Sequence, residues 1–330
     1  MLSPFQMNAF SIAGVGFTLA LAGCEPRFPH DPGLEQELAG RSRTEGLGIL
    51  TSSPTSGTMP ITYFDGSFEQ LNCCGKFRES WVVPGGRLLV AFDQSAARFG
   101  RTDRDSWGPN TAVFDLRGQE VYKLPSWIHA SFVSISLDGK MIAFLGQGGP
   151  PLNTGRRPRS GLLFGNIEAT EFRTVYSTRS DVPLLKPDER FETISWSPDD
   201  SELAYGKDGT VYIYNLKEGA SRKFGLGSNP LWSPDGRWIS YRGPRGEALI
   251  ADPSGKESRQ LMMGETIVHA LHWSPDNRYL LLTLTKNEAG LAWHHLMIYR
   301  LADAAMTGTG ESGMYLDDSG EDWILTGRRR

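Results

Sequence analysis

The sequence lacks the motifs by which many enzymes are identified. It contains no G-x-S-x-G nucleophile elbow, no H-E-x-x-H zinc motif and no P-loop. Cysteine is scarce, with only three residues, and no internal apolar run is long enough to span a membrane. We therefore expect no cofactor and no metal site, and the missing motifs favour a protein that is not an enzyme.

A strong charge of one sign is also missing. The formal net charge is −4, which gives no general electrostatic reason to bind nucleic acid or anionic lipid. Hydrophobic residues make up 39% of the chain and charged residues 22%, which are ordinary values for a soluble domain. We assign this domain to residues 46–330 and expect it to be a monomer.

A short phrase, Trp-Ser-Pro-Asp, occurs three times, at Trp196–Asp199, Trp232–Asp235 and Trp273–Asp276. Each copy lies between two short apolar runs, which predicts a strand, a tight turn and a second strand. Proline presets φ for the first turn position, and Gly236 or Asn277 can adopt the positive φ that follows. The prolines are 36 and 41 residues apart, a period that fits one four-stranded propeller blade.

Weaker copies extend the array in both directions, at Pro84–Arg87, Leu137–Lys140 and Leu316–Ser319. Residues 48–71 contain two further strands without partners, and Trp323–Leu325 forms a last one. Pairing these N- and C-terminal strands in one shared blade would close the ring and remove exposed sheet edges. The fold class is therefore all-β, a six-bladed β-propeller, with five or seven blades as alternatives.

The repeat also resembles that of a known family. An apolar run, Trp-Ser-Pro-Asp-Gly, a basic residue and a second run ending in Tyr are similar to the propeller repeat of TolB, the periplasmic partner of the Tol–Pal system. Propeller domains of prolyl oligopeptidase-type enzymes contain a similar repeat. The resemblance covers roughly residues 79–326 and implies the fold, since one repeat serves many functions.

The N-terminus is the second informative region. Ala9–Ala22 is apolar or small and suits the hydrophobic part of a signal peptide, which we assign to residues 1–23. It ends in Leu-Ala-Gly-Cys, which resembles the bacterial lipobox and implies that Cys24 receives diacylglycerol. Glu25 follows instead of the Asp that commonly signals inner-membrane retention, so we expect the outer membrane, with a soluble periplasmic protein as the alternative. An apolar N-terminal strand is the competing interpretation of the segment.

Between Cys24 and the domain, proline, glycine and charged residues suggest a tether over residues 24–45. Export would leave Cys73 and Cys74 in an oxidising compartment. They could form a strained disulfide between neighbours, a mixed disulfide with another thiol, or two free thiols.

Repeated acidic residues and paired histidines need no catalytic explanation. Asp199, Asp235 and Asp276 lie in hairpin turns of separate blades, where they can stabilise their own turns. His269 and His272 are three residues apart, which is a poor arrangement for one metal on a strand.

Loop geometry predicts where a partner would bind. In a propeller, the residues that begin the innermost strand and the loops between the second and third strands share one face around the central channel. The long insertions, Asp93–Asn110 and Gly146–Ser160, are both such loops, and the second carries three arginines without any acid. The candidate binding residues on this face are Arg78, Glu79, Ser131, Glu192, Thr193, Ser228, Asn229, His269, Arg156, Arg157 and Arg159.

Three functions follow as hypotheses. The first is a lipid-anchored module of the cell envelope that docks a protein or peptide, and the basic loop favours an acidic partner. The second is a propeller hydrolase or lyase that uses Glu192 and His269. The third is a binder of glycans or small ligands, with Trp107, Trp127 and Trp293 as stacking groups.

Overall fold

The computed structural model describes most of the chain from residue 29 onward, and the statements below refer to these residues. The described ranges are 29–51, 59–71, 79–82, 88–92, 111–115, 119–123, 129–148, 159–168, 172–177, 193–261, 267–288, 291–313 and 321–327. The signal peptide, Cys24, Cys73 and Cys74 lie outside these ranges, so the predictions made for them stay predictions.

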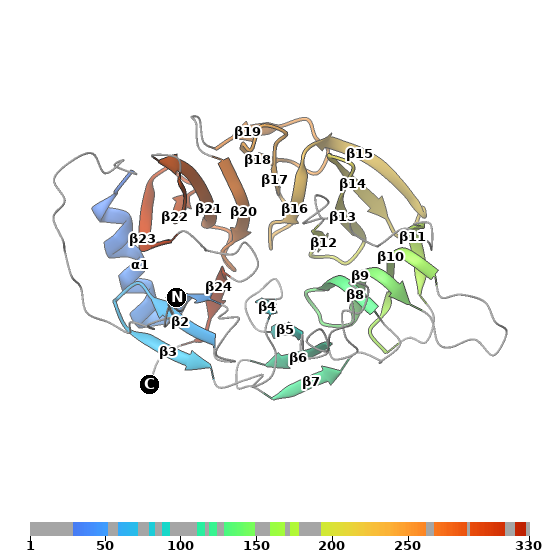
Figure 1. Cartoon of the computed structure of the whole chain (residues 1–330), viewed down its shortest axis with the longest axis horizontal. Coiled ribbons are helices and arrows are strands. Elements are labelled where there is room, and N and C mark those ends of the chain that lie inside the picture. Colours follow the sequence, from blue (N-terminus) through green and yellow to red (C-terminus); the bar gives the residue numbers. More distant parts are fainter. Residues whose placement is uncertain are drawn as a thin grey trace, which may run out of the picture.

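Six four-stranded antiparallel sheets surround a common axis, as the blades of a propeller do (Figure 1). From the innermost to the outermost strand, blade 1 consists of β24 (Glu321–Leu325), β1 (Leu47–Thr51), β2 (Met59–Tyr63) and β3 (Phe68–Leu71). In the same order, blade 2 consists of β4 (Glu79–Val82), β5 (Leu88–Phe92), β6 (Thr111–Asp115) and β7 (Glu120–Lys123). Blade 3 consists of β8 (His129–Ile135), β9 (Met141–Gly148), β10 (Arg159–Asn166) and β11 (Arg173–Ser177). Blade 4 consists of β12 (Ile194–Trp196), β13 (Glu202–Lys207), β14 (Thr210–Asn215) and β15 (Ala220–Leu226). Blade 5 consists of β16 (Ser228–Trp232), β17 (Ile239–Arg242), β18 (Ala248–Ala251) and β19 (Ser258–Gln260). Blade 6 consists of β20 (Ile267–Trp273), β21 (Tyr279–Glu288), β22 (Leu291–Arg300) and β23 (Met306–Gly313). The prediction of six blades is confirmed.

The repeated turns owe their shape to a serine and an aspartate. Between β12 and β13, Ser197 Oγ donates to Asp199 Oδ1 (2.6 Å) and accepts a hydrogen bond from the backbone N–H of Glu202 (2.9 Å). The same two bonds recur in blades 3, 5 and 6, around Ser136 and Asp138, Ser233 and Asp235, and Ser274 and Asp276. The interpretation that these aspartates stabilise their own turns is confirmed.

The repeated tryptophans link neighbouring blades. Trp196 Nε1 donates to the carbonyl oxygen of Ser134 in blade 3, and Trp273 Nε1 donates to that of Leu231 in blade 5, both at 3.2 Å. Both tryptophan side chains are buried. A buried indole usually has an acceptor for its N–H, and the preceding blade supplies one for Trp196 and Trp273, whereas Trp232 Nε1 has no hydrogen-bond partner among the described residues.

The hydrophobic core consists of layers between adjacent blades. Val113 of blade 2 packs with Val133 and Phe144 of blade 3, and Ile250 of blade 5 packs with Leu280 of blade 6. In these pairs, each blade therefore covers an apolar face of the next.

Blade 1 closes the ring with strands from both ends of the chain. β24 pairs antiparallel with β1, from Leu47 opposite Leu325 to Thr51 opposite Glu321. Trp323 Nε1 donates to the carbonyl oxygen of His272 in blade 6 at 3.0 Å. The predicted pairing of N- and C-terminal strands is confirmed.

The repeat pattern assigned to the C-terminus is wrong in one respect. It treated Trp323 as part of a second strand, after a turn at residues 316–319, which lie outside the described residues. Trp323 is instead in the innermost strand, at the place that Trp273 has in blade 6. The spacing misled because β21 and β22 are 10 residues long each and lengthen blade 6.

The predicted tether over residues 24–45 is also corrected, because most of it is helix α1 (Pro32–Glu45). Asp31 caps the N-terminus by accepting a hydrogen bond from the backbone N–H of Leu34 (2.9 Å), and Gly46 ends the helix with φ 70°. Proline at the helix start and glycine after its end suggested a linker, although both are also typical of helix ends. Leu34 and Leu38 are the only buried apolar side chains of this helix. The hydrophobic periodicity of its sequence is therefore weak.

Helix α1 lies beside the strands of blade 6 (Figure 1), and polar side-chain contacts link the two. Glu37 accepts hydrogen bonds from Tyr279 and Arg300, and Arg41 forms an ion pair with Asp276 at 2.6 Å. Burial opposes ionisation of Glu37, but the bonds from Tyr279 and Arg300 outweigh it and hold its pKa below the ordinary value. The helix is thus part of the folded domain.

Candidate binding site at the insertion rim

The strand ends that flank the two long insertions lie at one rim of the propeller. His129, the first residue of β8, lies opposite Gln147 near the end of β9, and Arg159 at the start of β10 lies opposite Gly148. The loop at residues 149–158 therefore leaves and returns at the edge where the innermost strand begins. The insertion at residues 93–110 connects β5 and β6 at the same edge of blade 2. We call this edge the insertion rim.

β-Bulges shape the innermost strands just inside the insertion rim. The register shifts between Ala130 and Phe132 in β8, between Ser228 and Leu231 in β16, and between Val268 and Ala270 in β20. A bulge leaves an extra residue outside the regular ladder and bends the strand. The predicted residues Ser131, Asn229 and His269 all lie within these shifts, so a common backbone feature marks this position in three blades.

Hydrogen bonds connect these positions from blade to blade. Thr193 Oγ1 donates to the carbonyl oxygen of Pro230 in blade 5, and Asn229 Nδ2 donates to that of His269 in blade 6, both at 3.2 Å. Asn229 has φ 55°, a conformation that asparagine tolerates better than most residues. Thr193 and Asn229 therefore fix the geometry of the rim, and Asn229 Oδ1 is buried without a hydrogen-bond partner among the described residues.

The other predicted residues divide into two groups. Glu79 begins β4 and Ser228 begins β16, both at the insertion rim. Arg159 was predicted in a loop but is the first residue of β10, because β9 and β10 are longer than the repeat suggested. Arg78, Arg156, Arg157 and Glu192 lie outside the described residues, and so does any contact between Glu192 and His269.

Sequence reasoning missed the bulges and the carbonyl acceptors they present. The signal available was the pair Asn229 and Pro230, since proline cannot donate to a sheet ladder and often accompanies a bulge.

The two histidines of β20 differ in their surroundings, because His272 Nδ1 lies 3.4 Å from Asp322 Oδ1 in the closing strand. Among the described residues, no group of three His, Cys, Asp or Glu side chains could hold a metal ion.

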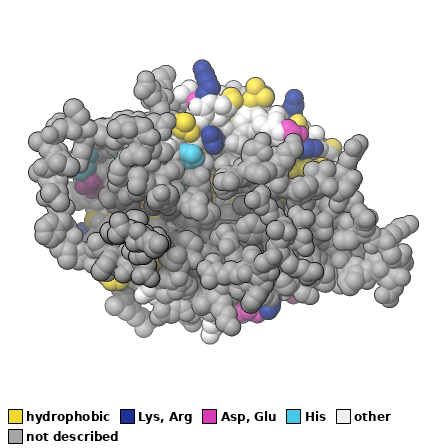
Figure 2. Space-filling view, in the orientation of Figure 1, with side chains coloured by type: hydrophobic (Ala, Val, Ile, Leu, Met, Phe, Trp, Pro, Cys, Tyr) yellow, Lys and Arg dark blue, Asp and Glu magenta, His cyan; other side chains and the backbone are white. Residues whose placement is uncertain are grey.

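The visible surface has no dominant charge where it is described. In Figure 2, described side chains emerge mainly along one part of the outline, where hydrophobic, basic and acidic groups are mixed. Within the described ranges, no helix is both long enough and apolar enough to cross a membrane.

Comparison with known proteins identifies partial sequence relatives, and no family model matches the chain. Dipeptidyl-peptidase 5 of Porphyromonas gingivalis is 27% identical over 135 residues, which cover 33% of this chain and 20% of that protein. The uncharacterized peptidase YuxL of Bacillus subtilis is 29% identical over 111 residues, covering 28% of this chain and 17% of the other. The chain thus spans about a fifth of the length of the curated relatives it matches, or less.

Solved structures resemble the chain over most of its length. A structure described as a TolB from Agrobacterium tumefaciens aligns with a TM-score of 0.51 at 14% identity, covering 83% of this chain and 90% of the other. TolB from Acinetobacter baumannii aligns with a TM-score of 0.54 at 13% identity, covering 84% of this chain and 66% of the other. At these identities the similarity concerns the fold, and the chain has a TolB-like β-propeller fold.

Proposed function

We propose that the protein is a lipid-anchored module of the bacterial cell envelope that docks a partner protein or peptide at the insertion rim. The observation that carries this proposal is that the strand ends flanking both long insertions lie at the same rim as the bulged innermost strands. Functional residues favour loops held by a rigid scaffold. The TolB-like fold supports a periplasmic location, and the partial matches to peptidases supply no catalytic group, since the G-x-S-x-G motif is absent from the sequence.

Anchoring through Cys24 is the first part of the proposal to test. Cys24→Ser should abolish labelling by a radioactive fatty acid and release the protein from the membrane fraction, because the lipid is attached through this thiol. Sucrose-gradient separation of inner and outer membranes would distinguish the two destinations, with the outer membrane expected. An unlabelled wild-type protein would refute the lipobox interpretation.

Docking is tested by replacing the basic residues of the insertion. The triple variant Arg156→Ala, Arg157→Ala, Arg159→Ala should capture less of an acidic partner from envelope extracts, chiefly because association becomes slower. The difference should shrink as salt is added, since exposed charges are screened over about 8 Å at physiological ionic strength. Thermal stability should change little, because surface substitutions usually alter the free energy of unfolding by no more than about 0.5 kcal/mol.

A matched control removes the same charge elsewhere. Lys217, Lys223 and Arg237 are exposed basic residues away from the insertion rim, and replacing all three with alanine should leave capture unchanged. If the rim variant and the control variant capture equal amounts of partner at low salt, the docking face is wrongly assigned.

A further inference from the structure

The chain enters the propeller at the rim opposite the insertions. The innermost strands end at this rim, where hairpin turns lead into the second strands, and we call it the turn rim. β1 begins here, because its first residue, Leu47, lies opposite Leu325 at the end of β24. Helix α1 comes directly before β1, and the carbonyl oxygen of Gly46 between them accepts a hydrogen bond from the backbone N–H of Thr326 (3.1 Å). The C-terminus of the helix is therefore fixed at the turn rim.

The first turns of α1 are held at the same rim. β22 ends there with Arg300, which lies opposite the first residue of β21. Arg300 forms an ion pair with Glu37 of α1 and lies 4.0 Å from Asp31, which caps the N-terminus of the helix. Near the start of β23, Thr307 Oγ1 donates to Glu35 Oε1 (2.9 Å). Both ends of α1 are thus bound to the turn rim, so the direction in which the chain leaves the domain is fixed.

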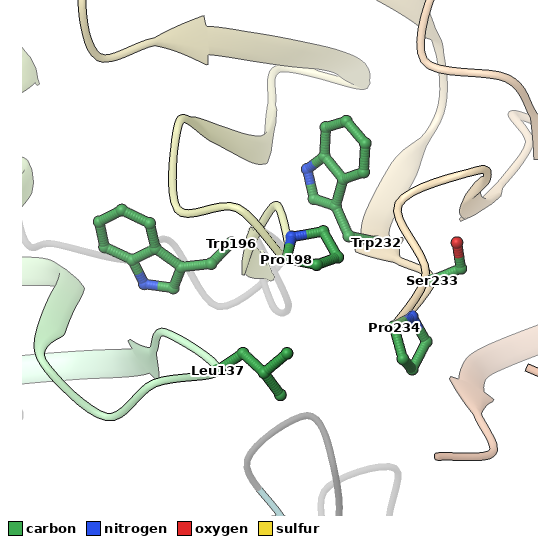
Figure 3. A pocket seen from close by; sticks show the side chains of 6 residues that line it. All are labelled: Leu137, Trp196, Pro198, Trp232, Ser233 and Pro234. Atoms are coloured by element: carbon green, nitrogen blue, oxygen red, sulfur yellow. The ribbon is translucent and has the colours of Figure 1, made fainter. Parts of the chain in front are cut away.

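The turn rim has a closed surface where its turns are described. Adjacent turns touch, because Asn277 Oδ1 of blade 6 accepts a hydrogen bond from the backbone N–H of Asp235 in blade 5 (3.0 Å). Figure 3 shows a hollow between the turns of blades 3, 4 and 5, lined by Leu137, Trp196, Pro198, Trp232, Ser233 and Pro234. Its space of about 10 Å³ is about what one water molecule needs. The long insertions begin and end at the other rim.

The segment that joins Cys24 to the helix is short. Cys24 and Asp31 are seven positions apart in the sequence. An extended chain spans at most about 3.6 Å per residue, so Cys24 lies within about 25 Å of Asp31. β22 has 10 residues and runs from the insertion rim to the turn rim, a distance of about 30 Å. A membrane that holds Cys24 is therefore within reach of the turn rim, whereas the segment is too short to pass the far end of β22.

We propose that the protein meets the lipid surface in one fixed orientation, with α1 and the turn rim of blade 6 toward the bilayer and the insertion rim away from it. This inference rests on the proposed lipid anchor at Cys24. Helix α1 then acts as a rigid spacer that carries the position of the anchor over to the propeller. A partner that docks at the insertion rim must approach from the aqueous compartment, since that rim faces away from the bilayer.

The anchor supplies the membrane affinity in this arrangement, and the helix supplies the orientation. Two acyl chains are enough for stable anchoring. Exposed basic and acidic side chains alternate on the described turns of the turn rim, as in Lys217 and Glu218 or Lys256 and Glu257. Attraction to anionic lipid needs a cluster of basic residues, so the orientation should not depend on the anionic lipid content of the membrane.

The test compares two positions on one blade. β15 runs from the turn rim to the insertion rim, because Asn215 of β14 lies opposite Ala220, and Thr210 lies opposite Leu226. Lys217, in the turn before β15, is exposed, and Leu226 at the end of β15 is 65% exposed. Each is replaced by cysteine, Lys217→Cys or Leu226→Cys, and labelled with a fluorescent donor.

The full-length protein is used with its native lipid, and Cys73→Ser and Cys74→Ser leave the new cysteine as the site of labelling. The protein is inserted from outside into vesicles of phosphatidylethanolamine and phosphatidylglycerol that contain an acceptor lipid. Energy transfer should be greater from Lys217→Cys than from Leu226→Cys, because the second position lies about one strand length farther from the bilayer. Gln36→Cys, at an exposed position of α1, should give the greatest transfer.

The outcomes separate the orientation from the anchor. Equal transfer from the two positions of blade 4, or greater transfer from Leu226→Cys, in protein that floats with the vesicles would overturn the orientation and leave the anchor intact. Protein that does not float with the vesicles would refute the lipid anchor, and the orientation with it.

A longer connection to the anchor should abolish the orientation. A flexible insertion of about 16 Gly and Ser residues between Pro29 and His30 adds about 20–25 Å of average reach. The difference in transfer between Lys217→Cys and Leu226→Cys should then be lost, although the protein stays on the vesicles. The same insertion placed after Arg330 is the matched control and should preserve the difference. If the difference survives the insertion before His30, the short connection to α1 is not what orients the protein.

Discussion

Trp323→Ala is expected to lower the free energy of unfolding by about 3–5 kcal/mol, the range for truncating a buried tryptophan. Trp323 is 1% exposed, and its ring stacks on that of Tyr279 with centroids 5.8 Å apart. It also donates to the carbonyl oxygen of His272 in blade 6. The substitution therefore removes a large apolar contact and a hydrogen bond at the one blade that joins both ends of the chain. Chemical denaturation followed by circular dichroism measures the effect.

A second tryptophan provides the control. Trp238 is only half-buried, beside Arg259 at 5.0 Å from its ring, so Trp238→Ala should cost clearly less. Equal losses for the two variants would argue against a special role for blade 1. Deleting residues 322–330 should go further and yield insoluble protein, because β1 would then present an unpaired edge. A soluble, monomeric truncated protein would contradict this view of the closure.

The double variant Leu34→Ala, Leu38→Ala is expected to detach helix α1 and to destabilise the protein by several kcal/mol. Each buried leucine truncated to alanine costs about 2–5 kcal/mol, and these two provide the buried apolar contact of the helix. The total loss is limited by the free energy with which α1 docks, because a detached helix leaves the remaining blades folded. Denaturant unfolding measures the loss of stability.

Limited proteolysis reports on the helix itself. Trypsin should cleave after Arg41 and Arg43 much faster in the double variant, since a short helix without tertiary contacts is marginally stable in water. Gln36→Ala, at an exposed position of the same helix, should be cleaved like wild type. If the double variant resists trypsin as well as wild type does, the leucines are not what holds α1.

The sequence predicts the propeller well because its blades repeat local chemistry. The serine, proline and aspartate of each turn act within a few residues of one another, so Ser197 and Asp199 reveal their turn without knowledge of the neighbouring blades. Closure was predictable for a general reason, since a ring of sheets has no free edge. The features that were missed depend on contacts between distant segments.

Helix α1 illustrates this limit, because Glu37 and Arg41 look like the charges of a solvated linker until Arg300 and Asp276 are placed beside them. The bulge at Asn229 likewise depends on pairing with a strand that follows it. Contacts between side chains of different blades are therefore the features that could not be predicted from a single sequence.

The order in which the chain is made has a consequence for how this ring is completed. The first strand, β1, must wait for β24, whose residues are synthesised after those of the other five blades, before both of its edges are paired. Contacts between residues so far apart in the chain form slowly, because a long loop must close before they contribute any stability. Five blades could fold while the edge of β1 is still open, and such an intermediate is prone to aggregation. The edge of β1 therefore needs to be shielded from other chains until β24 has been synthesised.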